Sequence, residues 1–85
     1  MSRLPQTTAH VQITRYSWQE GAIEGEVNAN GWVWRFCWCF RAGELKVEPS
    51  VGRALIREPL SRFLEKSDYL LEAGSNYSFV IRSSL

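Results

Sequence analysis

The stretch NGWVWRFCWCFR, residues 30–41, decides the fold of this chain. Every second position from 32 to 40 is aromatic: Trp32, Trp34, Phe36, Trp38 and Phe40. Side chains of a strand alternate between its two faces, so this pattern predicts a long strand over residues 31–41 with one continuous aromatic stripe. The positions in between are mixed and mostly polar, which indicates that the opposite face of the strand meets solvent.

Asn30-Gly31, directly before the stripe, is the strongest turn signal in the chain. A two-residue type I′ turn needs a positive φ at both positions, and Asn and Gly tolerate it. A turn centred there makes a hairpin in which apolar residues face apolar residues and acids face bases. The expected pairs are Ala29 with Trp32, Val27 with Trp34, Gly25 with Phe36, Ile23 with Trp38, Glu26 with Arg35, and Glu24 with Cys37.

Two further turns extend this hairpin into a four-stranded antiparallel meander. Ala42-Gly43 suits a two-residue turn, and Gln19-Glu20-Gly21 suits a three-residue loop with Gly in the left-handed position. These loops predict the pairs Phe40 with Leu45, Trp38 with Val47, Arg41 with Glu44, Ile13 with Val27, and Val11 with Ala29. The same register puts Arg15 on the core face opposite Gly25, unless a β-bulge turns it outward; the alternative is a guanidinium stacked on a neighbouring ring.

The apolar face of such a sheet needs a second layer, and residues 50–66 supply it. Ser50 can cap a helical segment, and Leu60, Phe63 and Leu64 have the spacing of an apolar helical stripe. Pro59 fits a first turn but not a helix interior, so we expect either one kinked helix or two short ones. Residues 77–81 alternate as a last strand, which we place beside the first strand.

The sequence therefore predicts one α+β domain over residues 1–85 with the order β-β-β-β-α-β and loose tails at 1–8 and 83–85. The helical segment is expected to pack on the aromatic face. That face also carries Ile23, Val27, Leu45, Val47, Ile13 and Val11, which favours a buried core over an exposed stacking platform.

The residues that most often carry catalysis or bind metal are few in this chain. Cys37 and Cys39 share a strand face, where neither a disulfide between them nor a four-ligand zinc site is expected. His10 is the only histidine and is predicted to lie at the far end of the sheet from both thiols. The sequence thus predicts no catalytic residues, no metal and no cofactor, and a protein that is not an enzyme.

The basic residues give the best candidates for binding, although the formal net charge is only +1. Eight of the ten are arginines, which suit bidentate pairing with carboxylate or phosphate. Helical spacing puts Arg53 with Arg57, and Arg62 with Lys66, on outward faces. The outer sheet face is expected to add a second candidate surface made of Tyr16, Trp18 and Arg35.

These residues predict a small non-catalytic interaction protein or accessory subunit that binds a protein partner with an acidic surface. A weak nucleic-acid-binding domain that uses the same arginines is the alternative, and the two differ in salt dependence. The polar start of the chain and the lack of a long apolar run predict a cytoplasmic protein without a membrane association.

Three stretches carry a resemblance over the whole chain: residues 8–14 (TAHVQIT), residues 50–60 (SVGRALIREPL) and residues 76–79 (NYSF). With them the chain resembles a family of short cyanobacterial proteins of unknown function. None of the three stretches is a functional motif, so the resemblance implies no site residues and no activity.

Overall fold

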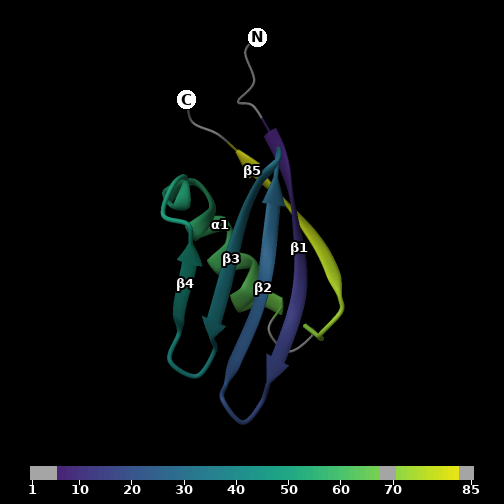
Figure 1. Cartoon of the computed structure of the whole chain (residues 1–85), viewed down its shortest axis with the longest axis vertical. Coiled ribbons are helices and arrows are strands. Elements are labelled where there is room, and N and C mark those ends of the chain that lie inside the picture. Colours follow the sequence, from purple (N-terminus) through teal and green to yellow (C-terminus); the bar gives the residue numbers. More distant parts are fainter. Residues whose placement is uncertain (1–5, 68–70, 83–85) are drawn as a thin grey trace.

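The computed structural model describes residues 6–67 and 71–82, which form a five-stranded antiparallel sheet with one helix across one face (Figure 1). The strand order in the sheet is β4-β3-β2-β1-β5, so the last strand lies beside the first, as predicted. The α+β order β-β-β-β-α-β is confirmed. The elements are β1 (Gln6–Ser17), β2 (Ala22–Ala29), β3 (Trp32–Cys39), β4 (Glu44–Glu48), α1 (Arg53–Ser67) and β5 (Asn76–Arg82).

The β2–β3 hairpin has the predicted register at every predicted pair, from Ala29 with Trp32 to Ile23 with Trp38. Asn30 and Gly31 have φ values of 53° and 84°, as a type I′ turn requires. Two residues with these angles leave one way of closing the hairpin, and this is why the turn alone fixed the register.

The other two hairpins close through longer loops than predicted. Ser17 pairs with Ala22, and Cys39 pairs with Glu44, so four residues lie in each loop. The β3–β4 loop is two residues longer than predicted, so Trp38 faces Leu45 rather than Val47. The β1–β2 loop is one residue longer, and a bulge in β1 adds a second position, so Val11 faces Val27 rather than Ala29. In the β3–β4 loop the Gly43 N–H donates to the Cys39 carbonyl at 2.8 Å, a closure that a two-residue turn cannot make.

A bulge in β1 settles the position of Arg15. The register shifts between Ile13 and Arg15, so Ile13 rather than Arg15 lies opposite Gly25. Arg15 turns to the outer face and pairs with Glu24. Of the two alternatives that the sequence left open, the bulge is the one found. The same shift moves Tyr16 to the core side, where it faces Ile23 and stacks on Phe40.

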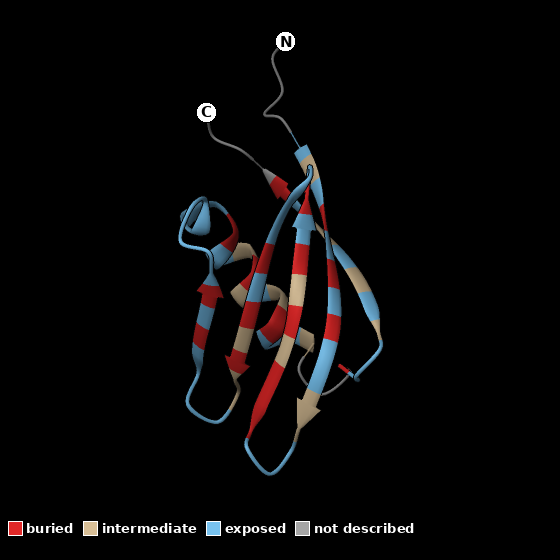
Figure 2. Ribbon diagram, in the orientation of Figure 1, coloured by how far each residue is buried: buried red, intermediate tan, exposed pale blue. Residues whose placement is uncertain are grey.

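The core lies between the sheet and α1, and buried residues alternate along the central strands (Figure 2). Trp34, Phe36 and Trp38 are buried in it, which confirms the core assignment for the middle of the stripe. The two ends of the stripe differ from this expectation. Trp32 is 55% exposed and stacks on Trp34 at the rim of the core, and Phe40 is half-buried.

Helix α1 is a single helix that contains Pro59, rather than two short helices. It begins at Arg53, directly after Gly52 with its positive φ of 70°, and Ser50 contributes its backbone carbonyl to the Arg53 N–H. Ile56, Leu60 and Leu64 form its buried side. Pro59 has no N–H for the Leu55 carbonyl one turn earlier; Leu55 is exposed, so water can bind that carbonyl.

The first strand begins earlier in the chain than predicted. Residues 6–8 belong to β1, where Thr8 pairs with Val80 of β5, so the predicted tail at 1–8 is wrong for these three residues. Residues 1–5 and the predicted tail at 83–85 lie outside the described residues.

Candidate functional site

Helix α1 carries the four basic residues that the sequence singled out. Arg53, Arg57, Arg62 and Lys66 are all exposed, whereas Ile56, Leu60 and Leu64 are buried. At 3.6 residues per turn, Arg62 and Lys66 lie on the side of the helix opposite the buried residues, and Arg53 and Arg57 flank the buried side at the start of the helix. Arg62 forms an ion pair with Glu58 one turn earlier. Within the described residues, no ion pair is found for Arg53, Arg57 or Lys66. We call these four residues and the helix surface between them the basic face of α1.

The charges of this face are placed against the electrostatics of the helix itself. The first turn of α1 holds no acidic residue but begins with Arg53, at the end where the helix dipole is positive. Arg57 follows at i+4, where two like charges repel each other. Each effect costs a helix some tenths of a kcal/mol. The N-terminal half of α1 is therefore less stable than the same helix with an acidic first turn.

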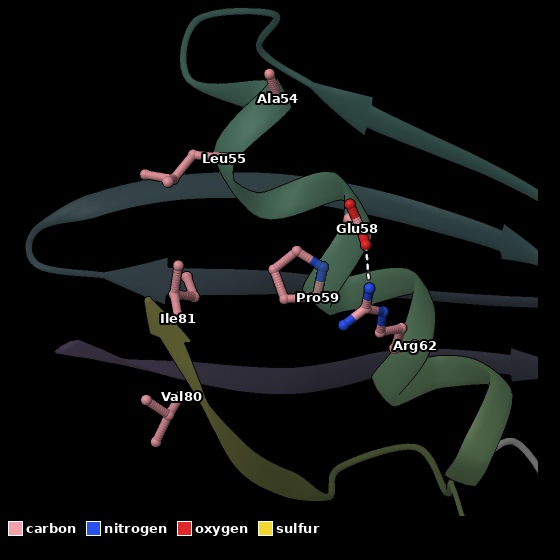
Figure 3. Close-up of a pocket in the computed structure, with 7 residues that line it drawn as sticks. All are labelled: Ala54, Leu55, Glu58, Pro59, Arg62, Val80 and Ile81. Carbon is pink, nitrogen blue, oxygen red and sulfur yellow. Dashed lines mark hydrogen bonds and ion pairs between the residues drawn. The ribbon is translucent and has the colours of Figure 1, made fainter. Parts of the chain in front are cut away.

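Two hollows flank the basic face. A groove of about 600 Å³ runs between α1 and β5 and is lined by Ala54, Leu55, Glu58, Pro59, Arg62, Val80 and Ile81. Figure 3 shows Pro59 pointing from the helix toward the side of Ile81, with the Glu58–Arg62 ion pair on the helix beyond it. A second, shallower hollow on the helix surface lies between Arg57 and Arg62. The basic side chains thus stand beside apolar surface that a partner can cover.

The outer sheet face does not bring its three predicted residues together. Arg35 lies there, exposed, 3.9 Å from Glu26 and opposite Glu48. Tyr16 is on the core side because of the bulge. Trp18, 67% exposed, stacks on Phe40 at the loop end of the sheet. The grouping of Tyr16 and Trp18 with Arg35 on one outer surface is therefore wrong.

Trp18 is instead part of a separate aromatic cluster that the sequence did not suggest. The Arg41 guanidinium lies 5.6 Å above the Trp18 ring, and its Nη1 donates to the Gln19 carbonyl at 3.1 Å. Arg41 also donates to the Trp18 carbonyl. These contacts tie the β1–β2 loop to the start of the β3–β4 loop, which gives Arg41 a structural role at this end of the sheet.

Arg15 on the outer face pairs with two carboxylates of the described chain. Arg15 donates to Glu24 at 2.6 Å and to Glu20 at 2.7 Å, and these two carboxylates raise the pKa of its guanidinium. Such solvent-exposed pairs contribute little to stability. Arg15 is thus engaged by its own chain, in contrast to Arg53 and Arg57 on α1.

Both cysteines are free thiols on the outer side of β3. Burial raises the pKa of the Cys37 thiol, and the neighbouring Cys39 raises it further. A thiol with a raised pKa holds little thiolate at neutral pH and is a poor nucleophile. His10 is exposed on β1, between Asn28 of β2 and Ser78 of β5, in the register.

Neither a metal-binding cluster nor a membrane-spanning helix occurs within residues 6–67 and 71–82. These residues contain no group of three or more His, Cys, Asp or Glu side chains able to hold a metal ion. No helix in these ranges combines the length and the apolar character needed to cross a membrane.

The α1–β5 groove is a feature that sequence reasoning missed. β4 forms one edge of the sheet and β5 the other, and the α1–β5 groove opens beside the second. The sequence predicted the strand at 77–81 but not the groove, because its walls come from two elements whose relative placement no local pattern encodes. One feature of the sequence indicates an open edge at this place: the residues on the exposed side of β5, Asn76, Ser78 and Val80, are all uncharged.

Comparison with protein families assigns the chain to one of them. A family model described as "Protein of unknown function (DUF3146)" matches residues 5–84, and the chain therefore belongs to this family. The comparison with curated proteins and the search of solved structures found no significant match.

Proposed function

We propose that the protein is a non-catalytic interaction module that binds an acidic surface of a partner protein through the basic face of α1. One observation carries this proposal: Arg53 and Arg57 lie where the helix dipole and their mutual repulsion disfavour them, and neither forms an ion pair with a carboxylate of the described residues. Local choices that cost stability without a compensating contact are typical of functional sites. An acidic partner would supply the missing contact.

The distribution of charge along the chain supports an acidic rather than a basic partner. Helix α1 holds four basic and two acidic residues. Strands β1–β4 with their loops, residues 6–48, hold four basic and five acidic residues. The modest formal charge of +1 thus hides a positive helix side and a slightly negative sheet side. Such a field steers an acidic partner to the helix side.

The alternative function is weak binding of nucleic acid by the same arginines. Phosphate binding releases counterions, so its affinity falls steeply and linearly with the logarithm of salt concentration. The bases would also need aromatic side chains to stack on, and the exposed Trp18 lies at the loop end of the sheet, next to Phe40 rather than on α1. The proposal further includes the cytoplasmic location and the cyanobacterial distribution expected from the sequence.

The variant Arg53→Glu/Arg57→Glu is expected to lose its acidic partner and to keep its fold. Reversal replaces attraction with repulsion at the contact, whereas acids in the first turns of α1 favour the helix dipole. The unfolding temperature should therefore be unchanged or rise by about 1–8 °C, from about 0.3–1 kcal/mol at 4–8 °C per kcal/mol. Quantitative capture by the tagged protein from a lysate of the source organism, together with thermal unfolding, measures both effects.

The matched control is Arg35→Glu/Lys46→Glu, which makes the same change in charge on the outer sheet face. Both side chains are exposed, and the Arg35–Glu26 contact of 3.9 Å contributes little to stability. This control should recover the same partners as the wild type. Loss of partners in the control but not in the helix variant would overturn the proposal and move the interaction surface to the outer sheet. Loss of a bound oligonucleotide, with a steep salt dependence, would favour the alternative.

A further inference from the structure

The two edges of the sheet are built differently. β4 has five residues, its exposed side chains are Glu44, Lys46 and Glu48, and Pro49 follows it. Short length, charge and proline are the devices by which proteins protect an edge from pairing with another strand. β5 has seven residues, and the exposed positions Asn76, Ser78 and Val80 carry no charge. One edge is thus protected, and the other has none of these devices at its exposed positions.

The hydrogen bonds of β5 show which of its backbone groups face the open edge. The Ile13 N–H donates to the Ser75 carbonyl at 2.9 Å, so Ser75 points toward β1. In an antiparallel ladder successive residues point to opposite sides, so Tyr77, Phe79 and Ile81 share that direction. The N–H and C=O groups of Asn76, Ser78 and Val80 then point away from β1. No loop or turn of the described chain donates a hydrogen bond to them or accepts one from them.

The α1–β5 groove lies directly beside this row of backbone groups. Leu55 is 47% exposed and Val80 is 53% exposed, and both line the groove with Pro59 and Ile81 (Figure 3). A strand added to β5 would send every second side chain toward α1 and the others to the outer face. The groove would receive the first set. Backbone pairing at a sheet edge, with pockets for alternate side chains, is how several domains bind extended peptides.

The charges decide what kind of segment fits. The walls of the groove include Glu58 and Arg62, which pair with each other, and the neighbouring hollow on the helix adds Arg57, for which no ion pair is found among the described residues. The side chains of β5 from Asn76 to Ile81 carry no charge. A second copy of this chain would bring another helix with four basic and two acidic residues to the same place, where like charges repel. An extended segment with a net negative charge complements the site.

We infer that the partner's binding element is an extended acidic segment that adds a strand to the open edge of β5 and sends alternate side chains into the α1–β5 groove. This inference rests on the proposed function, because it uses the same basic face, and it adds the conformation and position of the bound segment. β5 would then lie between β1 and the added strand, and the sheet would gain a sixth strand beyond the five of the free protein.

Selection from a library of random linear peptides, each longer than the seven residues of β5, tests this on the full chain. Enriched peptides should be acidic and should lack proline in their central positions. Two methylated forms of an enriched peptide can be made, one with methyl groups on the odd-numbered backbone nitrogens and one on the even-numbered. One form should lose binding and the other should bind nearly as well as the parent peptide, because only one set of N–H groups meets β5. Hydrogen exchange of the Ser78 and Val80 amides should slow in the complex.

The protein supplies its own controls. The amides of Leu45 and Val47 face the open edge of β4 by the same alternation, and their exchange should not change. Ser78→Pro removes one outward N–H at a strand edge that tolerates proline, and should weaken binding about tenfold. Ser78→Val keeps that N–H and should bind like the wild type. If Ser78→Pro does not fold, the methylated peptides still decide the matter.

Other outcomes would overturn the inference. Methylation that is tolerated in both phases, enrichment of peptides with a helical apolar spacing, protection of Leu45 and Val47 instead, or no enriched peptide at all would each do so. Self-association through β5 would show that the occupant is a second copy. Suppose that acidic peptides leave the Ser78 amide unprotected in the wild type and lose binding in Arg53→Glu/Arg57→Glu. The proposed function then stands and the strand addition fails. If the enriched peptides are neutral and bind that variant equally well, the proposed function fails instead.

Discussion

Replacing Trp34 by alanine lowers the free energy of unfolding by about 3–5 kcal/mol, the range for truncation of a large buried aromatic side chain. Trp34 is 3% exposed and stacks on Trp32. Its Nε1 donates to the Val51 carbonyl at 2.9 Å, and its ring fills the space beside Gly52. This one side chain therefore connects β3 to the loop that precedes α1. The total free energy of unfolding of a small domain is only about 5–15 kcal/mol, so this loss is a large share of it. Denaturant unfolding should therefore show that a large part of the variant is already unfolded.

Two controls separate burial from the hydrogen bond. Trp34→Phe keeps a ring in the core but leaves the Val51 carbonyl without the indole N–H, and should cost about 1–2 kcal/mol. Trp32→Ala removes an aromatic ring that is more than half exposed, and should cost about 1 kcal/mol, the value of the stacked pair. Equal losses for Trp32→Ala and Trp34→Ala would contradict the placement of the first ring at the rim and the second in the core.

Gly25→Ala is expected to cost about 3 kcal/mol, although it adds one methyl group. A Cβ at this position would lie 2.3 Å from the Gln12 carbonyl oxygen and 2.9 Å from the Phe36 ring. The closest atom belongs to the backbone of β1, so no side-chain rotation can relieve the contact. β1 and β2 would have to separate at the point where the bulge begins. Thermal unfolding of the variant measures the loss.

Gly43→Ala is the control for the conformational freedom of glycine. Gly43 has a positive φ of 69°, and a Cβ there would meet no atom within 4 Å. Its substitution therefore carries the cost of the left-handed conformation alone, about 1–2 kcal/mol. A loss at Gly25 no larger than that at Gly43 would show that β1 yields easily and that the close approach of its backbone to β2 is unimportant.

How far the sequence predicts this fold depends on the turns. Asn30-Gly31 demands two positive φ values and left one register, which is correct throughout β2–β3. The two other loops contain a single glycine with positive φ each, Gly21 and Gly43, and such loops close with several lengths. The β3–β4 register came out wrong by two positions, and so did the β1–β2 register from Ile13 back to Ala9, beyond the bulge in β1. A shift of two leaves every side chain on its predicted face, so the predicted core survived the error.

A shift of one residue has the opposite effect, and the bulge in β1 is the example. It moved Arg15 outward and Tyr16 inward, and so removed Tyr16 from the predicted outer surface. The residue between Ile13 and Arg15 is Thr14. A glycine there would have indicated a bulge, but a threonine does not. Trp18 was misplaced for a related reason, because a four-residue loop rather than a three-residue loop carries it to Phe40.

The candidate site was predictable where it depends on one element. Helical spacing predicted that Arg53, Arg57, Arg62 and Lys66 of α1 are exposed, and all four are. It did not show that Glu58 pairs with Arg62 while the first two arginines have no partner among the described residues. The β5 edge and its groove depend on the packing of α1 against β5, and no single stretch of sequence contains that information.

Titration of the wild-type protein with a short oligoglutamate peptide, followed at every backbone amide by NMR, tests the central claim most directly. It requires no substitution and reports where an acidic chain binds. If the basic face of α1 is the interaction surface, the amide shifts concentrate around Arg53, Arg57 and the adjoining α1–β5 groove, and they fade as salt screens the charges. Shifts centred on Arg35 and Lys46 of the outer sheet, or spread evenly over the protein, would contradict it.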